Sequence, residues 1–163
     1  MLAALAIAAC LAWIAVPYLA LELRSDAVTG TGELRVVRLD DGSSVHLAPA
    51  TAIAFKNGAN KRTLTLLKGE AWFDVAHDEA RPFRVMAGES TVTVLGTAFS
   101  VRRTDGGTDV AVQRGHVAVT TPGATEGARV DLVAGQSVTL AQGAAHRGTI
   151  RPDRVDRKST RLN

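Results

Sequence analysis

The sequence of 163 residues contains a single cysteine, Cys10, so no disulfide can form within the chain. A zinc site built from several cysteines is excluded for the same reason. Aromatic residues make up only 4% of the chain, and its basic residues are scattered or gathered near the end. Nucleic-acid-binding domains cluster their cations or carry aromatic stacking platforms. The net charge of +3 therefore does not indicate a nucleic-acid partner.

Motifs of catalysis and cofactor binding are also missing from the sequence. There is no Walker-type or GxGxxG loop and no GxSxG elbow around a serine. The histidines lack the spacing of metal ligands; they are His46, His77, His116 and His146. Asp74, Asp78 and Glu79 lie near His77, but such a group is more typical of a surface turn than of a general base. We expect no enzyme activity, no cofactor and no metal ion.

One long apolar segment opens the chain, because Met1 to Leu21 contain no charged residue. About 20 helical residues at roughly 1.5 Å each span the hydrocarbon core of a bilayer. Trp13 and Tyr18 suit interfacial positions. We predict a transmembrane helix over residues 1–22; a secretory signal, or a lipoprotein signal around Ile7 to Cys10, is the alternative. An apolar run that starts without a flank indicates that upstream sequence is missing.

Beyond a linker at residues 23–32, the chain alternates apolar and polar residues up to about residue 145. This period of two is typical of half-buried strands, and no later stretch holds a helical apolar stripe. The inward set includes Phe73, Phe83, Phe99 and Val117. The sequence predicts an all-β strand domain over residues 33–145, followed by a charged, disordered tail over residues 146–163.

The glycines indicate an internal repeat within this strand domain. Gly42 and Gly88 lie 46 residues apart, as do Gly69 and Gly115, and Gly135 follows Gly88 by 47. We expect these glycines to fill turns that need positive φ or a close backbone approach. A repeat of about 46 residues favours a short β-solenoid or a rolled two-layer strand domain, with a β-sandwich as the alternative.

Several ordered motifs resemble the FecR-like family of transmembrane sigma-factor regulators, or anti-sigma factors. The segments that carry the resemblance are Asp41 to Leu47, Gly69 to Ala76, Arg81 to Val85, Leu95 to Val101, Val112 to Val119 and Leu132 to Gln136. Ala48 is a departure, since an Asn often stands there. The motif residues, expected to be mainly structural, are Asp41, Gly42, Gly69, Glu70, Phe73, Asp74, Pro82, Phe83, Gly96, Thr97, Phe99, Gly115 and Gly135.

The resemblance implies a role in signal transduction across the bacterial inner membrane. Such a protein has one membrane span and a periplasmic folded domain, and it regulates iron transport. It relays the state of a TonB-dependent outer-membrane transporter to an extracytoplasmic-function sigma factor. The cytoplasmic segment that would bind the sigma factor, and the carboxy-terminal domain that would meet the transporter, are expected to lie outside this fragment.

Trp72 is the one candidate partner contact outside the structural motif. It lies opposite in phase to Ala71 and Phe73, which predicts that it faces away from the core. An exposed Trp can mark a partner surface, although a neighbouring loop could equally cover it. The alternative function is a non-catalytic envelope module, structural or carbohydrate-binding, that uses Trp72 as its contact.

Overall fold

The computed structural model describes residues 25–58, 61–121, 129–141 and 144–150. This part of the chain is all-β, as predicted, and its thirteen strands belong to one continuous sheet. The strands are β1 (Ala27–Val28), β2 (Arg35–Arg38), β3 (Ser44–Leu47), β4 (Ala52–Gly58), β5 (Lys61–Asp74), β6 (Phe83–Ala87), β7 (Ser90–Val94), β8 (Ala98–Thr104), β9 (Gly107–Arg114), β10 (His116–Thr120), β11 (Arg129–Val133), β12 (Gln136–Ala141) and β13 (Ala144–Thr149).

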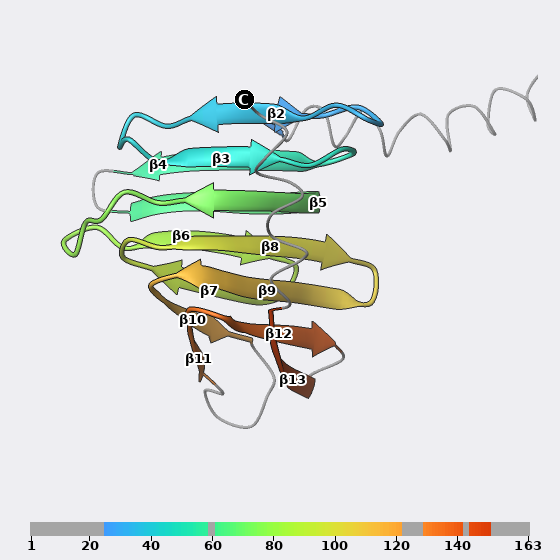
Figure 1. Cartoon of the computed structure of the whole chain (residues 1–163). Coiled ribbons are helices and arrows are strands. Elements are labelled where there is room, and N and C mark those ends of the chain that lie inside the picture. Colours follow the sequence, from blue (N-terminus) through green and yellow to red (C-terminus); the bar gives the residue numbers. More distant parts are fainter. Residues whose placement is uncertain (1–24, 59–60, 122–128, 142–143, 151–163) are drawn as a thin grey trace, which may run out of the picture.

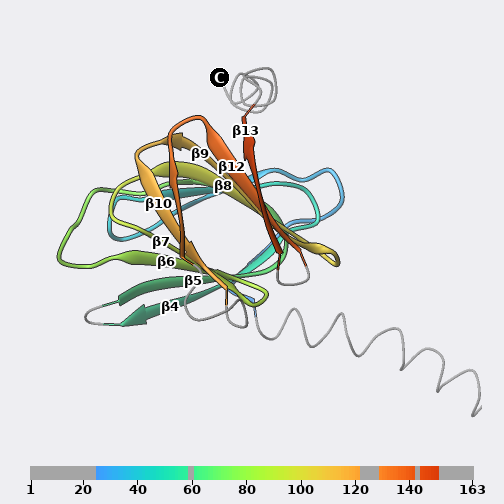
Figure 2. The same ribbon diagram turned by 90° about the horizontal axis from the view of Figure 1, so that it is seen from below.

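The sheet is curled and open, with β5 as the strand that joins its two flanks (Figures 1 and 2). In the first half of β5, Arg62 to Leu66 pair with β6 on one side, and this half pairs with β4 on the other. The first flank continues from β6 through β7 and β10 to β11. Gly69 to Asp74 pair with β8, and most of this half also pairs with β3; β9, β12 and β13 follow in the second flank. The β5–β6 pair is parallel, and the other pairs of described strands are antiparallel.

A bend at Gly69 lets one strand serve both flanks. The inward side chains before it are Leu64 and Leu66, and those after it are Ala71 and Phe73, so the inward phase changes from even to odd residues. Gly69 has a φ of +88°, a conformation that side chains other than glycine rarely adopt. A Cβ there would lie 2.7 Å from the Cα of Thr51. Glycine therefore allows both the positive φ at this position and the close approach of Thr51, the residue before β4.

The core lies inside the curl and consists of the inward residues of both flanks. Phe73, Phe83, Phe99 and Val117 are fully buried, as the alternation predicts. The rings of Phe73 and Phe99 stack with their centroids 4.9 Å apart, and Phe73 also lies 6.4 Å from Phe83. These aromatic contacts join the β5, β6 and β8 backbones into one packed interior.

The glycines of the predicted repeat all have positive φ. Gly42 and Gly88 lie in the β2–β3 and β6–β7 hairpin turns. Gly115 separates β9 of the second flank from β10 of the first, a passage between flanks comparable to that at Gly69. The solenoid description and the 46-residue repeat stay predictions, since the sheet itself shows only a curled, open roll.

No helix within the described ranges is long and apolar enough to cross a membrane. The transmembrane helix predicted over residues 1–22 lies outside those ranges. The described strands extend from β1 at Ala27 to β13, which ends at Thr149. The domain boundaries predicted from the sequence stay predictions.

Candidate functional site

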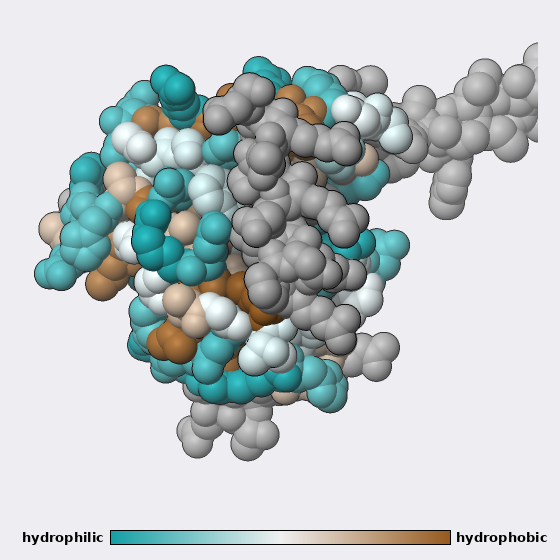
Figure 3. Space-filling model, in the orientation of Figure 1, coloured by the Kyte–Doolittle hydropathy of each residue, from teal (hydrophilic) through white to brown (hydrophobic). Residues whose placement is uncertain are grey.

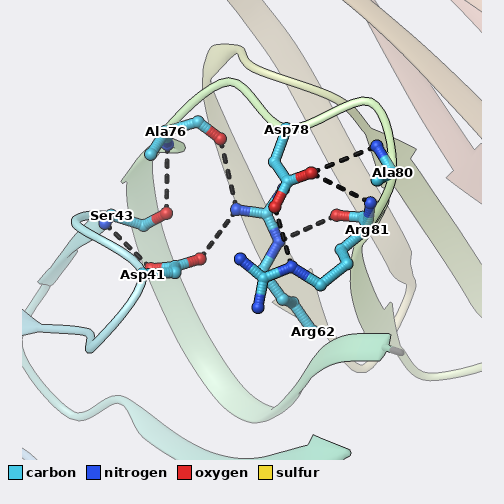
Figure 4. A network of polar contacts seen from close by, with 7 residues as sticks. All are labelled: Asp41, Ser43, Arg62, Ala76, Asp78, Ala80 and Arg81. Carbon is cyan, nitrogen blue, oxygen red and sulfur yellow. Dashed lines mark hydrogen bonds and ion pairs between the residues drawn. The ribbon is translucent and has the colours of Figure 1, made fainter. Parts of the chain in front are cut away.

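A buried polar cluster around Arg62 holds one end of the roll together (Figure 4). Arg62 Nη1 donates to Asp41 Oδ2 at 2.8 Å and to the Ala76 carbonyl at 3.2 Å, and Nε donates to the Arg81 carbonyl at 2.9 Å. The Ala76 N–H donates to Ser43 Oγ at 3.0 Å. We call these residues (Asp41, Ser43, Arg62, Ala76 and Arg81) the Arg62 clamp. It fixes the β2–β3 hairpin against the connection from β5 to β6.

The electrostatics of the clamp favour an ionised Asp41. Burial raises the pKa of this carboxyl, but the hydrogen bonds from Arg62 and from Ser43 outweigh burial and hold the pKa below its usual value of 3.8. The Arg62 side chain is 4% exposed, and its guanidinium lies 5.6 Å from the centre of the Phe83 ring. Its Nη2 has no hydrogen-bond partner among the described residues. The cation is therefore balanced by Asp41, two carbonyls and an aromatic face.

The motif residues predicted from the sequence include Asp41 but not its partner Arg62. A signal was present, because Arg62 shares the even phase of Leu64 and Leu66 and so points inward. A charged residue on the buried face of a strand needs a partner. The sequence could not show that this partner lies 21 residues earlier in a hairpin turn.

The Leu95 to Val101 segment packs around Gly96 and Thr97 at the entry to β8. A Cβ at Gly96 would lie 2.7 Å from the Cα of His77, so only glycine fits beside that loop. Thr97 is 1% exposed, and its Oγ1 donates to the His116 carbonyl at 3.1 Å. The Thr97 carbonyl accepts from the Val75 N–H at 3.0 Å. These contacts tie β8, β10 and the chain after β5 together.

Other motif residues also lie at joints between strands. The Thr51 Oγ1 donates to the Glu70 carbonyl at 3.0 Å, beside Gly69. The Gly135 N–H donates to the Val112 carbonyl at 2.8 Å, and the Gly42 N–H donates to the Leu39 carbonyl at 3.0 Å. Pro82 directly precedes β6 and the buried Phe83.

Trp72 lies on the outer face of the second flank, as its phase predicts. It is half-buried, because the ring of His46 packs edge-on against it with centroids 4.9 Å apart. Its Nε1 donates to Gln113 Oε1 at 3.3 Å. Burial also lowers the pKa of His46, while the charge of Asp74 acts in the opposite direction. Trp72 thus contacts His46 on the neighbouring strand β3 and Gln113 on β9, two strands away in the sheet.

The acidic residues near His77 form surface pairs. The hydrogen bond from Arg81 Nε to Asp78 Oδ2, at 2.8 Å, holds the pKa of Asp78 below its usual value. Glu79 lies 3.5 Å from His77 Nε2, and Asp74 accepts from Arg114 Nη2 at 2.7 Å. In the part of the chain that the structure describes, no group of three or more His, Cys, Asp or Glu side chains could hold a metal ion.

The visible outer surface is mostly hydrophilic, with small and separate hydrophobic spots (Figure 3). A pocket of about 280 Å³ lies between the β6–β7 and β8–β9 hairpins and the β12–β13 pair, and Arg103 lines it. The guanidinium of Arg103 is already engaged, since its Nη1 donates to the Leu67 carbonyl at 2.8 Å. Arg103 therefore joins β8 to the backbone of β5 and is not free to bind a ligand through Nη1.

Comparison with known proteins decides the family. The profile of the family described as FecR protein matches residues 25–118, more than half of the chain. This chain belongs to the FecR family. The match begins just before β1 and ends within β10, so it includes the Arg62 clamp and the Gly96–Thr97 joint.

Solved structures resemble the FecR chain over a wider range. Two crystal structures of a candidate anti-sigma factor from Parabacteroides distasonis match it with 27% identity and TM-scores of 0.72 and 0.71. Each match covers 80% of this chain and 62% of the other chain. The FecR chain thus spans less than two thirds of the length of these relatives. No curated protein matches it.

Proposed function

We propose that this chain is a membrane-anchored regulator that relays an envelope signal to a sigma factor. The observation that carries the proposal is the FecR family match over residues 25–118. The likeness to an anti-sigma factor candidate at 27% identity supports the same class of function. In this proposal the strand domain is a rigid docking platform and performs no catalysis.

The finer parts of the proposal come from the family resemblance and from the sequence. Residues 1–22 form the single transmembrane helix, the strands from β1 to β13 form the periplasmic domain, and a charged tail follows β13. The sigma factor is of the extracytoplasmic-function class. The signal comes from a TonB-dependent outer-membrane transporter for iron complexes. The domain is a short solenoid-like roll with a repeat of about 46 residues.

A reporter experiment in the source bacterium tests the relay. Residues 32–140 are deleted from the chromosomal gene, and transcription from the sigma-dependent promoter is compared with and without inducer. We expect the induced-to-uninduced ratio to fall to about one. A matched control strain carries Val133→Ala, a change at a 51% exposed side chain, and keeps the wild-type ratio. An unchanged ratio in the deletion strain would contradict the proposal.

The carbohydrate-binding alternative depends on Trp72 and predicts a different result. Binding of the full chain to envelope polysaccharide is measured with and without the change Trp72→Ala. The relay proposal expects no polysaccharide binding by either protein. Binding that is lost on Trp72→Ala would favour the envelope module instead.

A further inference from the structure

The β2 edge strand, Arg35–Arg38, is the starting point for a second interaction. Within the described residues β2 pairs only with β3, so its other edge presents unpaired backbone groups. Residues 30–36 are all exposed, including Leu34 at 57% and Val36 at 44%. Such an edge is a template for an added strand unless side chains prevent it.

Arg35 and Arg38, at the two ends of β2, give this edge a positive charge that a partner strand must match. Arg35 lies opposite the apolar Leu47 and Arg38 opposite the neutral Ser44, so β3 provides no countercharge. Neither arginine forms an ion pair with a residue that the structure describes. The acidic neighbours are Glu33, which accepts from the Gly30 N–H at 2.8 Å, and Asp41, which is paired with Arg62; Asp40 is exposed in the hairpin turn.

The order Arg-Val-Val-Arg disfavours in-register pairing of β2 with a second copy of the same strand. If two β2 strands pair in antiparallel register, Arg35 of one faces Arg38 of the other, and in parallel register each arginine faces its own copy. Like charges directly opposite each other destabilise a strand pair. Residues 151–163 place Asp153 and Asp156 three positions apart, but their five basic residues give them a net positive charge that does not complement this edge.

We propose that β2 binds an extended acidic segment of a partner protein by strand addition. The partner residues opposite Arg35 and Arg38 lie three positions apart, with two residues between them opposite Val36 and Val37. The complementary pattern is therefore acidic–apolar–apolar–acidic. Carboxylates at the outer positions pair with the guanidinium groups, while the backbone of the segment continues the second flank.

Synthetic peptides test this pairing on the full chain kept in a non-ionic detergent. The probe is the acetylated peptide Thr-Glu-Val-Val-Glu-Thr, and the charge control is Thr-Lys-Val-Val-Lys-Thr, both labelled for fluorescence anisotropy at low salt. We expect the acidic peptide to bind at least ten-fold more tightly than the lysine peptide. Arg35→Glu/Arg38→Glu should reverse that preference. Arg102→Glu/Arg147→Glu changes the net charge equally at exposed positions elsewhere and should leave the preference unchanged.

Two further measurements separate strand addition from simple charge attraction. The acidic peptide with N-methylated backbone amides keeps its charges but loses its donors, so its affinity should fall at least ten-fold. Hydrogen exchange of residues 34–39 should slow when the unmodified peptide is bound. Equal binding of the methylated peptide, an unchanged preference in Arg35→Glu/Arg38→Glu, or protection confined to another strand would overturn the proposal. None of these outcomes depends on the sigma-factor relay, which the reporter experiment tests separately.

Discussion

Single aromatic side chains provide much of the packing in this fold. Phe73 and Phe99 are fully buried and stack on each other across the β5–β8 pair. We expect Phe73→Ala or Phe99→Ala to lower the free energy of unfolding by about 3–5 kcal/mol, because each leaves a cavity that the sheet cannot close. Urea denaturation measures the change. Leu34→Ala, at a 57% exposed side chain, is the control and should change stability by less than about 0.5 kcal/mol.

Arg62 is the polar residue on which the fold depends most. Arg62→Ala would leave Asp41 largely buried and unpaired, since its side chain is only 12% exposed. Breaking one side of a buried ion pair costs about 3–5 kcal/mol. Thermal and urea unfolding of Arg62→Ala should show such a loss. Arg129→Ala removes a pair with Asp131 in which both side chains are about half exposed, and it should cost no more than about 1 kcal/mol. Equal losses in the two variants would contradict the importance of the clamp.

The same pair gives the protein an acid-sensitive stability. The pKa of Asp41 is lower in the folded state than its usual 3.8, so the unfolded chain binds more protons in this range. Asp41 therefore contributes its full share of the free energy of unfolding at pH values above its pKa in the unfolded chain. That share is lost as the pH falls through the pKa of Asp41 in the folded protein. We expect the wild-type protein to lose stability on acidification more steeply than Asp41→Asn. Urea midpoints between about pH 5 and pH 2 measure the slopes; parallel slopes would exclude Asp41 as the cause.

At the scale of the element, the bend in β5 is the feature that allows one sheet to curl. Gly69→Ala places a Cβ against Thr51 and also forces a side chain into a positive φ. Gly135→Ala is the matched control, because Gly135 has a φ of +86° but nothing within 4 Å of the added Cβ. The left-handed conformation alone costs roughly 1–2 kcal/mol. We expect Gly69→Ala to be the more destabilising in urea, and equal losses would show that the close approach of Thr51 is unimportant.

The strands show which features the alternation of apolar and polar residues can predict and which it cannot. The alternation predicted the inward phases of Phe73, Phe83 and Phe99, and the glycine pattern predicted a turn at Gly42. The alternation gave no indication that the stretches before and after Gly69 join in one strand, β5. It also gave no indication that β6 runs parallel to β5. Partner choice depends on contacts between distant residues, which the period of a strand does not encode.

At the scale of the whole molecule, the relay proposal requires the strand domain to lie outside the cytoplasm. Alkaline phosphatase, which is active only in the periplasm, is fused after Asn163 of the full chain. We expect high phosphatase activity in the bacterial host. The matched fusion of β-galactosidase, which works only in the cytoplasm, should be inactive. The reverse pattern would contradict the periplasmic location, and would leave the β2 strand-addition test unaffected.

Alternation and ordered motifs were enough to predict that the domain is all-β, that Phe73, Phe83, Phe99 and Val117 point inward, and which family the chain resembles. Alternation and ordered motifs are local properties, because side chains of a strand point to opposite faces whatever the strand pairs with. The tertiary structure decided the curl of the sheet, the pairing of Arg62 with Asp41 and the unpaired edge of β2. These features arise where segments distant in sequence meet, and burial then sets both the charge balance of the clamp and the exposure of the edge.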